Sequence, residues 1–248
     1  PPPPGQHYPS PPPPPPPPPA KFSVQFNGVD QFIQLPRVED IVGVSLWVLV
    51  DANQSAREHV LLDARMGSYR GSFGNRDTTR DLWAKLYIDG VLQSEAEWTS
   101  VPRDNWIHIH LEPQESFQDD ITLMGRYTPL TGMHLAGRLA EVYMWRRPLD
   151  AVEVLTLATQ GWDQSQQNSG AGVYFPFEEG QGNDVHELYS NAVGKINGGA
   201  EWIEDTVNTP GGYKPVQVIA PSPPPLPPFP PPNPSPPYPP SPPNPSPP

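Results

Sequence analysis

Two histidines stand two residues apart in a stretch that alternates apolar and polar side chains. Residues 106–111 read WIHIHL, with His108 and His110 on the same face of a predicted strand. Histidines with this spacing could chelate a metal ion. No third ligand is evident nearby in the sequence, so the alternative is a solvent-facing or partly packed histidine pair beside Trp106.

Adjacent acidic residues are the candidates for glycoside hydrolysis, which needs two carboxylates across one cleft. Glu178 and Glu179 are neighbours in the chain, so on a strand their side chains would point to opposite faces. Asp119 and Asp120 have the same spacing and are expected in a turn before a strand. We expect neither pair to be catalytic and predict that the protein is not an enzyme.

Two further features concern sugars. Six of the seven tryptophans lie in or beside predicted strands, but Trp98 stands in a polar stretch and is the candidate for an exposed sugar-stacking ring. Asn53-Gln54-Ser55 is an N-glycosylation acceptor in a predicted loop, so Asn53 is a candidate glycosylation site.

These residues would be positioned by many short strands. Residues 22–26 and 82–88 alternate between apolar and polar or large side chains, and Asp89-Gly90 is a hairpin turn signal. Residues 41–50 (IVGVSLWVLV) are apolar on both faces, which predicts a central strand of a sandwich. Further strands are expected at 32–35, ended by Pro36, and at 60–62, 106–111, 121–124, 135–145, 173–177 and 196–203, with loops at 51–58 and 66–80.

One helix is expected after Asp150. Asp150 and Glu153 have the spacing of a capping box, an apolar run follows, and Gly161 is placed to end the helix. Many short strands with one short helix predict an all-β, two-sheet antiparallel sandwich.

Proline dominates both ends of the chain. Residues 1–19 and 221–248 hold 33 of the 41 prolines, including nine in succession at 11–19. Proline fixes φ and lacks an N–H, so these segments are predicted to be polyproline II rods. The predicted organisation is a rod at 1–19, a β-sandwich domain at 20–220 and a second rod at 221–248.

Charge is confined to the middle of the chain. All 15 basic and 27 acidic residues lie in 20–220, which therefore carries the net charge of −12. An acidic domain without a basic stripe argues against nucleic acid, and no apolar run is long enough to insert into a membrane. The absence of cysteine excludes disulfides and thiolate metal sites. Because the first residue is Pro1, we expect a processed product or a segment of something longer.

The middle segment resembles the laminin-G-like and concanavalin-A-like jelly rolls, the group that includes lectins, pentraxins and glucanases. The resemblance spans nearly all of 22–203 and lies in SVQFNGVDQFIQL (23–35), VSLWVLV (44–50), LYIDGVL (86–92), NWIHIH (105–110), GRLAEVYMWRRPL (137–149) and YFPFEEGQG (174–182). It implies a jelly-roll fold. In most members the YFPFEEGQG-like segment precedes the SVQFNG-like strand, whereas here it comes last. Either the domain is circularly permuted, or it is a variant with that strand at its C-terminus. The two rods should then leave the domain from nearby points.

The same resemblance bears on catalysis and on calcium. The E-x-D-x-x-E motif of the glucanase branch is absent. Many laminin-G-like domains bind calcium, and the corresponding D-x-S-G-N-G segment reads ELYSNA here, with Glu187 for Asp and both glycines lost. Glu187 and Asn191 are therefore weak candidates for calcium ligands, and a polar loop is the alternative; otherwise no cofactor is expected.

The rods resemble the hydroxyproline-rich glycoproteins of volvocine green-algal cell walls and ciliary surfaces, through repeated Ser-Pro-Pro and Asn-Pro-Ser-Pro-Pro. That resemblance implies an extracellular location, hydroxylated prolines and covalent O-glycans. The candidate O-glycosylation sites are Ser10, Ser222, Ser235, Ser241 and Ser246.

Two functions follow as hypotheses. The first is a structural matrix or surface glycoprotein that self-assembles into a fibre through its rods, with Tyr8, Phe229 and Tyr238 stacking on proline rings. The second is a lectin-type module that binds carbohydrate, including matrix glycans, and uses the rods as spacers. Sequence alone names neither a glycan nor a polymer geometry.

Overall fold

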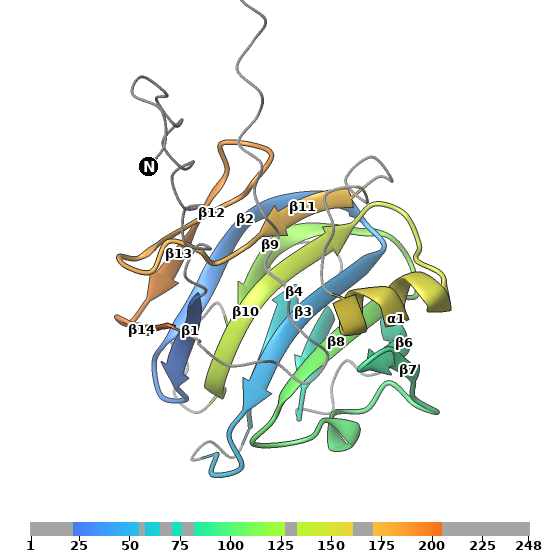
Figure 1. The fold of residues 1–248 in the computed structure, drawn as a ribbon, viewed down its shortest axis with the longest axis horizontal. Helices are drawn as coiled ribbons and strands as arrows, with labels where there is room; N and C mark the ends of the chain where they lie inside the picture. Colours follow the sequence, from blue (N-terminus) through green and yellow to red (C-terminus); the bar gives the residue numbers. More distant parts are fainter. Residues whose placement is uncertain are drawn as a thin grey trace, which may run out of the picture. The chain divides into compact units, whose positions relative to one another are not determined.

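The computed structural model describes residues 22–54, 58–64, 71–75, 82–126, 133–160 and 171–204. The chain separates into two units, Pro1–Gln217 and Val218–Pro248, and the described residues all belong to the first. They form an all-β, two-sheet antiparallel jelly-roll sandwich with one short α-helix, as predicted (Figure 1). No described helix has the length and apolar character needed to span a membrane.

The larger sheet has eight described strands. Their bounds are β1 Phe22–Asn27, β3 Gly43–Val50, β6 Trp83–Ile88, β7 Val91–Leu92, β8 Trp106–Pro113, β10 Ala136–Trp145, β11 Ala171–Phe175 and β14 Glu201–Glu204. The order across the sheet is β14-β1-β10-β3-β8-β6-β7, and β11 pairs with β10 beyond the end of β1. The predicted central strand is β3, which pairs with β10 on one side and β8 on the other.

The smaller sheet has six described strands. They are β2 Phe32–Ile41, β4 Val60–Ala64, β5 Gly71–Gly74, β9 Phe117–Leu123, β12 Asp184–His186 and β13 Val193–Asn197, in the order β12-β13-β2-β9-β4-β5. The prediction that Pro36 ends a strand is wrong, because β2 continues through it. The register against β9 shifts between Gln34 and Arg37, and this bulge accommodates the missing N–H of Pro36.

Two other sequence expectations need correction. The segment 66–80, expected as one loop, contains the strand β5, which pairs with β4. The predicted strand 196–203 is two strands, β13 and β14, separated by Gly198 and Gly199 with φ of +80° and +72°. The two glycines allow left-handed backbone that other residues adopt at a cost, so the chain turns there and changes sheet.

The main apolar core lies between the two sheets, and a second, smaller one lies on the outer face of the large sheet. Alternation separates the two cores: Val142 and Met144 of β10 belong to the main core, whereas Tyr143 and Trp145 point the other way. The helix α1, Ala151–Gln160, covers this outer cluster with Val154 and Leu157. Figure 1 shows α1 in front of the large sheet beside β8, β6 and β7.

The first and last described residues lie side by side. β1 pairs antiparallel with β14, and Phe22 stands opposite Glu204. The segments 1–21 and 205–248 therefore join the described domain at adjacent backbone positions, on the strand pair at one end of the large sheet. The expectation that the two rods leave the domain from nearby points concerns segments that lie outside the described residues.

Candidate functional site

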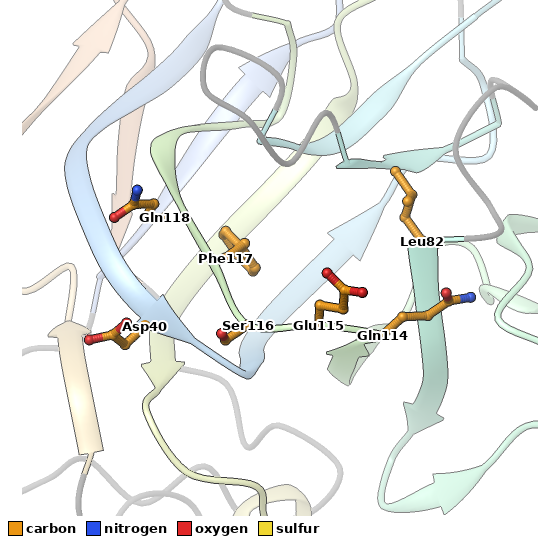
Figure 2. A pocket seen from close by; sticks show the side chains of 7 residues that line it. All are labelled: Asp40, Leu82, Gln114, Glu115, Ser116, Phe117 and Gln118. Carbon is orange, nitrogen blue, oxygen red and sulfur yellow. The ribbon is translucent and has the colours of Figure 1, made fainter.

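A polar cavity of about 650 Å³ opens where two turns of the sandwich meet. One side is Asp40, at the corner between β2 and β3, and another is Leu82, just before β6. The remaining wall is the turn between β8 and β9 with the start of β9: Gln114, Glu115, Ser116, Phe117 and Gln118. Figure 2 shows these side chains around the opening. We call this cavity the corner groove.

Backbone geometry presents Asp40 to the corner groove. The register between β2 and β9 shifts between Val38, opposite Asp119, and Ile41, opposite Phe117, so two residues of β2 bulge out at this point. Asp40 has a φ of +58°, a left-handed conformation that aspartate tolerates better than most residues. The corner is held by Arg146, whose Nε donates to the Glu39 carbonyl at 3.2 Å. The bulge thus turns Asp40 out to solvent.

The opposite wall has an apolar base and a polar rim. Phe117 is buried and packs edge-on against Trp83, with 6.4 Å between the ring centroids. The Gln114 N–H donates to the Leu82 carbonyl at 3.0 Å, which ties the turn to the start of β6. Glu115 and Gln118 are exposed, as are Gln114 and Ser116.

The corner groove therefore offers carboxylates, amides and a hydroxyl around an apolar floor. Carboxylates accept hydrogen bonds, amides both donate and accept, and hydroxyls do either. Such a set suits a neutral ligand rich in hydroxyl groups, whose apolar C–H surface can rest on Leu82 and Phe117. A carbohydrate has this chemistry.

The two histidines of the sequence analysis lie far from solvent. His108 and His110 share the outer face of β8, as predicted, but they are 2% and 0% exposed, so the expectation of a solvent-facing or partly packed pair is wrong. The His108 ring packs against Trp47 at 5.4 Å between centroids. Burial, followed by the nearby His110, lowers the pKa of His108 to about 3. His108 is therefore neutral at physiological pH.

His110 belongs to a buried polar chain that superficially resembles a nucleophile with its base. Trp145 Nε1 donates to Ser45 Oγ at 2.9 Å, which leaves the Ser45 hydroxyl free to donate to His110 Nδ1 at 2.7 Å. The proton of neutral His110 then sits on Nε2, 3.8 Å from Glu112 Oε1. Ser45 and His110 have no exposed surface, so no substrate reaches this hydroxyl.

No metal site forms around these histidines in the described part of the chain. A search of the described residues finds no group of three His, Cys, Asp or Glu side chains able to hold a metal ion. The carboxylate beside His110 is Glu112, which is paired with Lys85 at 2.8 Å. Burial raises the pKa of Glu112, but His110 and Lys85 lower it by more, so the carboxylate stays charged.

Glu187, one of the two weak calcium candidates, is buried, and its carboxylate accepts hydrogen bonds from the backbone. Its Oε1 accepts from the Tyr174 N–H and its Oε2 from the Tyr189 N–H, each at 3.0 Å. Asn191 is exposed in the turn before β13. Both oxygens of Glu187 thus hold the chain between β11 and the segment after β12, which is a structural role available without any metal.

Trp98 is not the exposed ring that the sequence suggested. It is 6% exposed and lies in a 3-10 helix, Trp98–Ser100, where Nε1 donates to His59 Nε2 at 2.9 Å. Phe73 packs edge-on at 5.5 Å and the Arg103 guanidinium lies 4.7 Å from the ring centre. Glu97 and Thr99, the polar neighbours that made Trp98 look exposed, point outward while the indole enters the core.

The two acidic pairs, Asp119 with Asp120 and Glu178 with Glu179, lie in different parts of the domain. Asp119 and Asp120 lie within β9 and not in a turn before it; Asp119 is buried, and Asp120 lies 4.0 Å from Arg37. Glu179 follows β11, where its Oε1 accepts from the His186 N–H at 2.7 Å.

Asn53 lies exposed in the loop after β3, as the sequence predicts, so it is accessible to glycosylation. The remaining candidates lie outside the described residues: Tyr8, Ser10, Ser222, Phe229, Ser235, Tyr238, Ser241 and Ser246.

The corner groove itself was not predicted. Asp40 and the turn 114–118 are more than seventy residues apart in the sequence, and neither carries a recognisable motif. The available signal was the polar run Gln114-Glu115-Ser116 between two apolar strands, which predicts only a turn.

Comparisons with known proteins find a distant likeness among solved structures. No protein-family model matches the chain, and no curated protein matches it. Among solved structures, a protein from Bacteroides ovatus described as a "putative carbohydrate binding protein" aligns with a TM-score of 0.49 and 12% identity. The alignment covers 77% of this chain and 62% of that one. At this distance the function of that protein does not transfer to this chain.

Proposed function

We propose that the domain is a carbohydrate-binding module that takes a neutral sugar in the corner groove. The observation that carries the proposal is the combination of exposed Asp40, Glu115 and Gln118 with the half-buried Leu82 at the same opening. Sugar hydroxyls pair with the carboxylates and amides, and the C–H face of the ring packs on Leu82.

We further propose that the module binds without cleaving. The E-x-D-x-x-E motif is absent, and the adjacent acids at 119–120 and 178–179 do not face a common cleft. Incubation with each bound oligosaccharide should leave its chromatographic profile unchanged; appearance of shorter products would make the protein a hydrolase.

The test is binding of the full chain to a panel of neutral, uronate-containing and sulphated oligosaccharides, with Asp40→Asn and Glu115→Gln as groove variants. Asparagine tolerates left-handed backbone as aspartate does, so Asp40→Asn changes the charge and spares the corner. We expect each variant to weaken binding about tenfold, the effect of one charged hydrogen bond. Glu201→Gln, exposed on β14, is the matched control and should bind as wild type. Equal binding by all four proteins would remove the groove as the site.

A second proposal concerns the whole chain: an extracellular structural glycoprotein that assembles into a fibre through its proline-rich ends. It is supported by the uncharged, proline-rich composition of 1–19 and 221–248 and by the pairing of β1 with β14, which attaches both segments at one side of the domain. Mass spectrometry of native protein should show hydroxyproline and O-glycans at the serines of the Ser-Pro-Pro repeats. A native mass equal to the unmodified 27.3 kDa would contradict it.

A further inference from the structure

Exposed apolar side chains gather at one end of the large sheet. Six large apolar side chains among the described residues are exposed, and three of them lie on the outer face at this end: Leu92 of β7, whose partner Tyr87 belongs to the outer cluster, and Val152 and Leu155 of α1, at 53%, 72% and 46%. We call these three side chains the apolar edge. Val91 pairs with Ile88 of the main core and points to the opposite face of β7.

The two halves of the apolar edge are in contact. A β-carbon on Gly90, in the turn that leads into β7, would lie 2.7 Å from Leu155 Cδ1, so the hairpin tip touches the helix. Val152 is one turn before Leu155 on the same helix face. α1 buries Val154 and Leu157 against the outer cluster and still presents apolar side chains outward. A surface helix usually shows polar residues on that face, and a contiguous exposed apolar patch marks an interaction site.

The apolar edge lies at the opposite end of the sheet from Phe22 and Glu204, where the described domain begins and ends. In the strand order β14-β1-β10-β3-β8-β6-β7, the flanking segments attach at β14 and β1, whereas the patch lies at β7 and α1. Six strand spacings of about 4.8 Å put roughly 29 Å between the two ends. A tail that leaves one molecule at β14 and binds another at β7 makes a head-to-tail contact that does not close on itself.

Charge selects among the partners that could cover the apolar edge. Asp89, Glu95 and Asp150 are exposed around it, and the chain carries a net charge of −12. This disfavours a second acidic domain and an anionic membrane, since both would place like charges together. Residues 221–248 carry no charge, and their side chains other than serine and asparagine are prolines, one leucine and two aromatic rings.

We propose that the apolar edge binds the proline-rich segment 221–248 of a second copy of this chain. Proline rings and Phe229 would pack on the aliphatic side chains of β7 and α1. The inference rests on the second proposal above, assembly through the tails, and is independent of the corner groove.

Two measurements on the full chain test it. Light scattering across a range of protein concentrations follows assembly, and fluorescence anisotropy follows binding of a labelled synthetic peptide with the sequence of 221–248. The variant is Leu92→Thr with Val152→Gln, which replaces two exposed apolar side chains of the apolar edge and keeps strand and helix propensity. Val29→Gln is the matched control, because Val29 is 56% exposed in the turn after β1, at the other end of the sheet.

We expect the double variant to bind the peptide about tenfold more weakly than wild type and to lose concentration-dependent assembly, while Val29→Gln behaves as wild type. Equal peptide binding by all three proteins would overturn the inference. A second result would also overturn the inference: the double variant fails to assemble, but neither it nor the wild type binds the peptide. In that case the apolar edge contacts the domain of a second copy and not its tail. Peptide binding by chains that stay monomeric at every concentration would mean that each chain's own tail occupies the edge. If the double variant still assembles, the proposal of assembly through the tails stands, but the apolar edge is not the surface that binds them.

Discussion

Two buried histidines, His108 and His110, lie on the outer face of the large sheet, and they make the stability of the domain depend on pH. His108 has a pKa of about 3 because burial penalises its charged form, whereas an unfolded chain restores the ordinary value of 6.5. Above pH 6.5 neither state takes up this proton. Below it, the unfolded state binds the proton and the folded state does not, so stability is lost progressively as the pH falls from 6.5 toward 3.

The size of this effect can be estimated for His108. Between pH 7 and pH 5 the free energy of unfolding should fall by about 2 kcal/mol from this residue alone. Burial also lowers the pKa of His110, which adds to the fall, while the pKa of Asp89, raised by burial, acts in the opposite direction at lower pH. Chemical denaturation at pH 7, 6 and 5 measures the slope.

The His108→Gln variant should be less stable than the wild type at pH 7. It should also lose most of the decrease in the free energy of unfolding that His108 causes between pH 7 and pH 5. His186→Gln is the control, because His186 is exposed and its substitution should leave the slope unchanged. A wild-type stability that is flat from pH 7 to pH 5 would show that His108 takes up a proton without unfolding.

The Glu187 carboxylate has a structural role, because each of its oxygens accepts a backbone N–H. Glu187→Ala removes the acceptor of two backbone N–H groups, one of them fully buried, and should lower the free energy of unfolding by about 2–3 kcal/mol. Asn191→Ala, on an exposed side chain, should change it by less than about 0.5 kcal/mol. Denaturation in calcium and in EGTA should give the same values for all three proteins. A calcium-dependent stability lost in both variants would restore the calcium site.

Among the elements, α1 has the clearest link from sequence to structure. The predicted capping box is present: the Glu153 N–H donates to Asp150 Oδ1 at 2.8 Å, and the Asp150 N–H donates to Glu153 Oε2 at 2.9 Å. Nη1 and Nη2 of Arg147 each donate a hydrogen bond to the same Glu153 carboxylate. The cap therefore fixes where the helix starts and how it enters the outer cluster.

Asp150→Ala should cost about 1 kcal/mol of stability, the usual effect of losing an N-cap. Asp150→Ser, which keeps a capping oxygen, should remain close to wild type, and thermal and chemical denaturation would measure both. Equal losses in the two variants would mean that the Asp150 charge matters and the capping geometry does not.

Local signals in the sequence located most elements. Alternation found β1, β6 and β8, and Asp89-Gly90 forms the predicted hairpin turn with φ of +49° and +80°. β5 was missed because its Gly-Ser-Phe-Gly sequence has little strand character, and its pairing with β4 is tertiary. Pro36 was misjudged because a bulge, which depends on the partner strand, relieves the lost hydrogen bond.

The site could be predicted less well than the fold, for a related reason. A period of two shows that His108 and His110 share a face, but it cannot show that α1 and the outer cluster cover that face, because α1 lies more than forty positions away and the rest of the cluster comes from other strands. The corner groove likewise depends on two distant turns that the sandwich brings together. Neither the burial of Trp98 nor the position of Asp40 has a local sequence signature.

At the scale of the whole molecule, the fold closes on itself before the proline-rich segments begin. The main core is made of residues between Val24 and Ala200, with Trp202 packed against it, and the pair β1 and β14 brings both ends of the described domain together. The domain should therefore not need either segment in order to fold.

A chain cut to residues 20–220 should melt cooperatively at the temperature of the full chain and keep its near-ultraviolet circular dichroism. A chain cut further, to 20–200, is the informative comparison because it lacks β14. It loses the backbone pairing from Phe22 to Gln25, the edge-on contact of Phe22 with Trp202 at 6.5 Å, and the Trp202 Nε1 hydrogen bond to the Gly182 carbonyl at 2.8 Å. We expect it to lose about 2–4 kcal/mol of stability, because a packed aromatic ring and its hydrogen bond are removed together. If the 20–220 chain fails to show a melting transition, the proline-rich segments pack into the fold. If the 20–200 chain melts like the full one, β14 is dispensable and the domain closes without the strand that joins its ends.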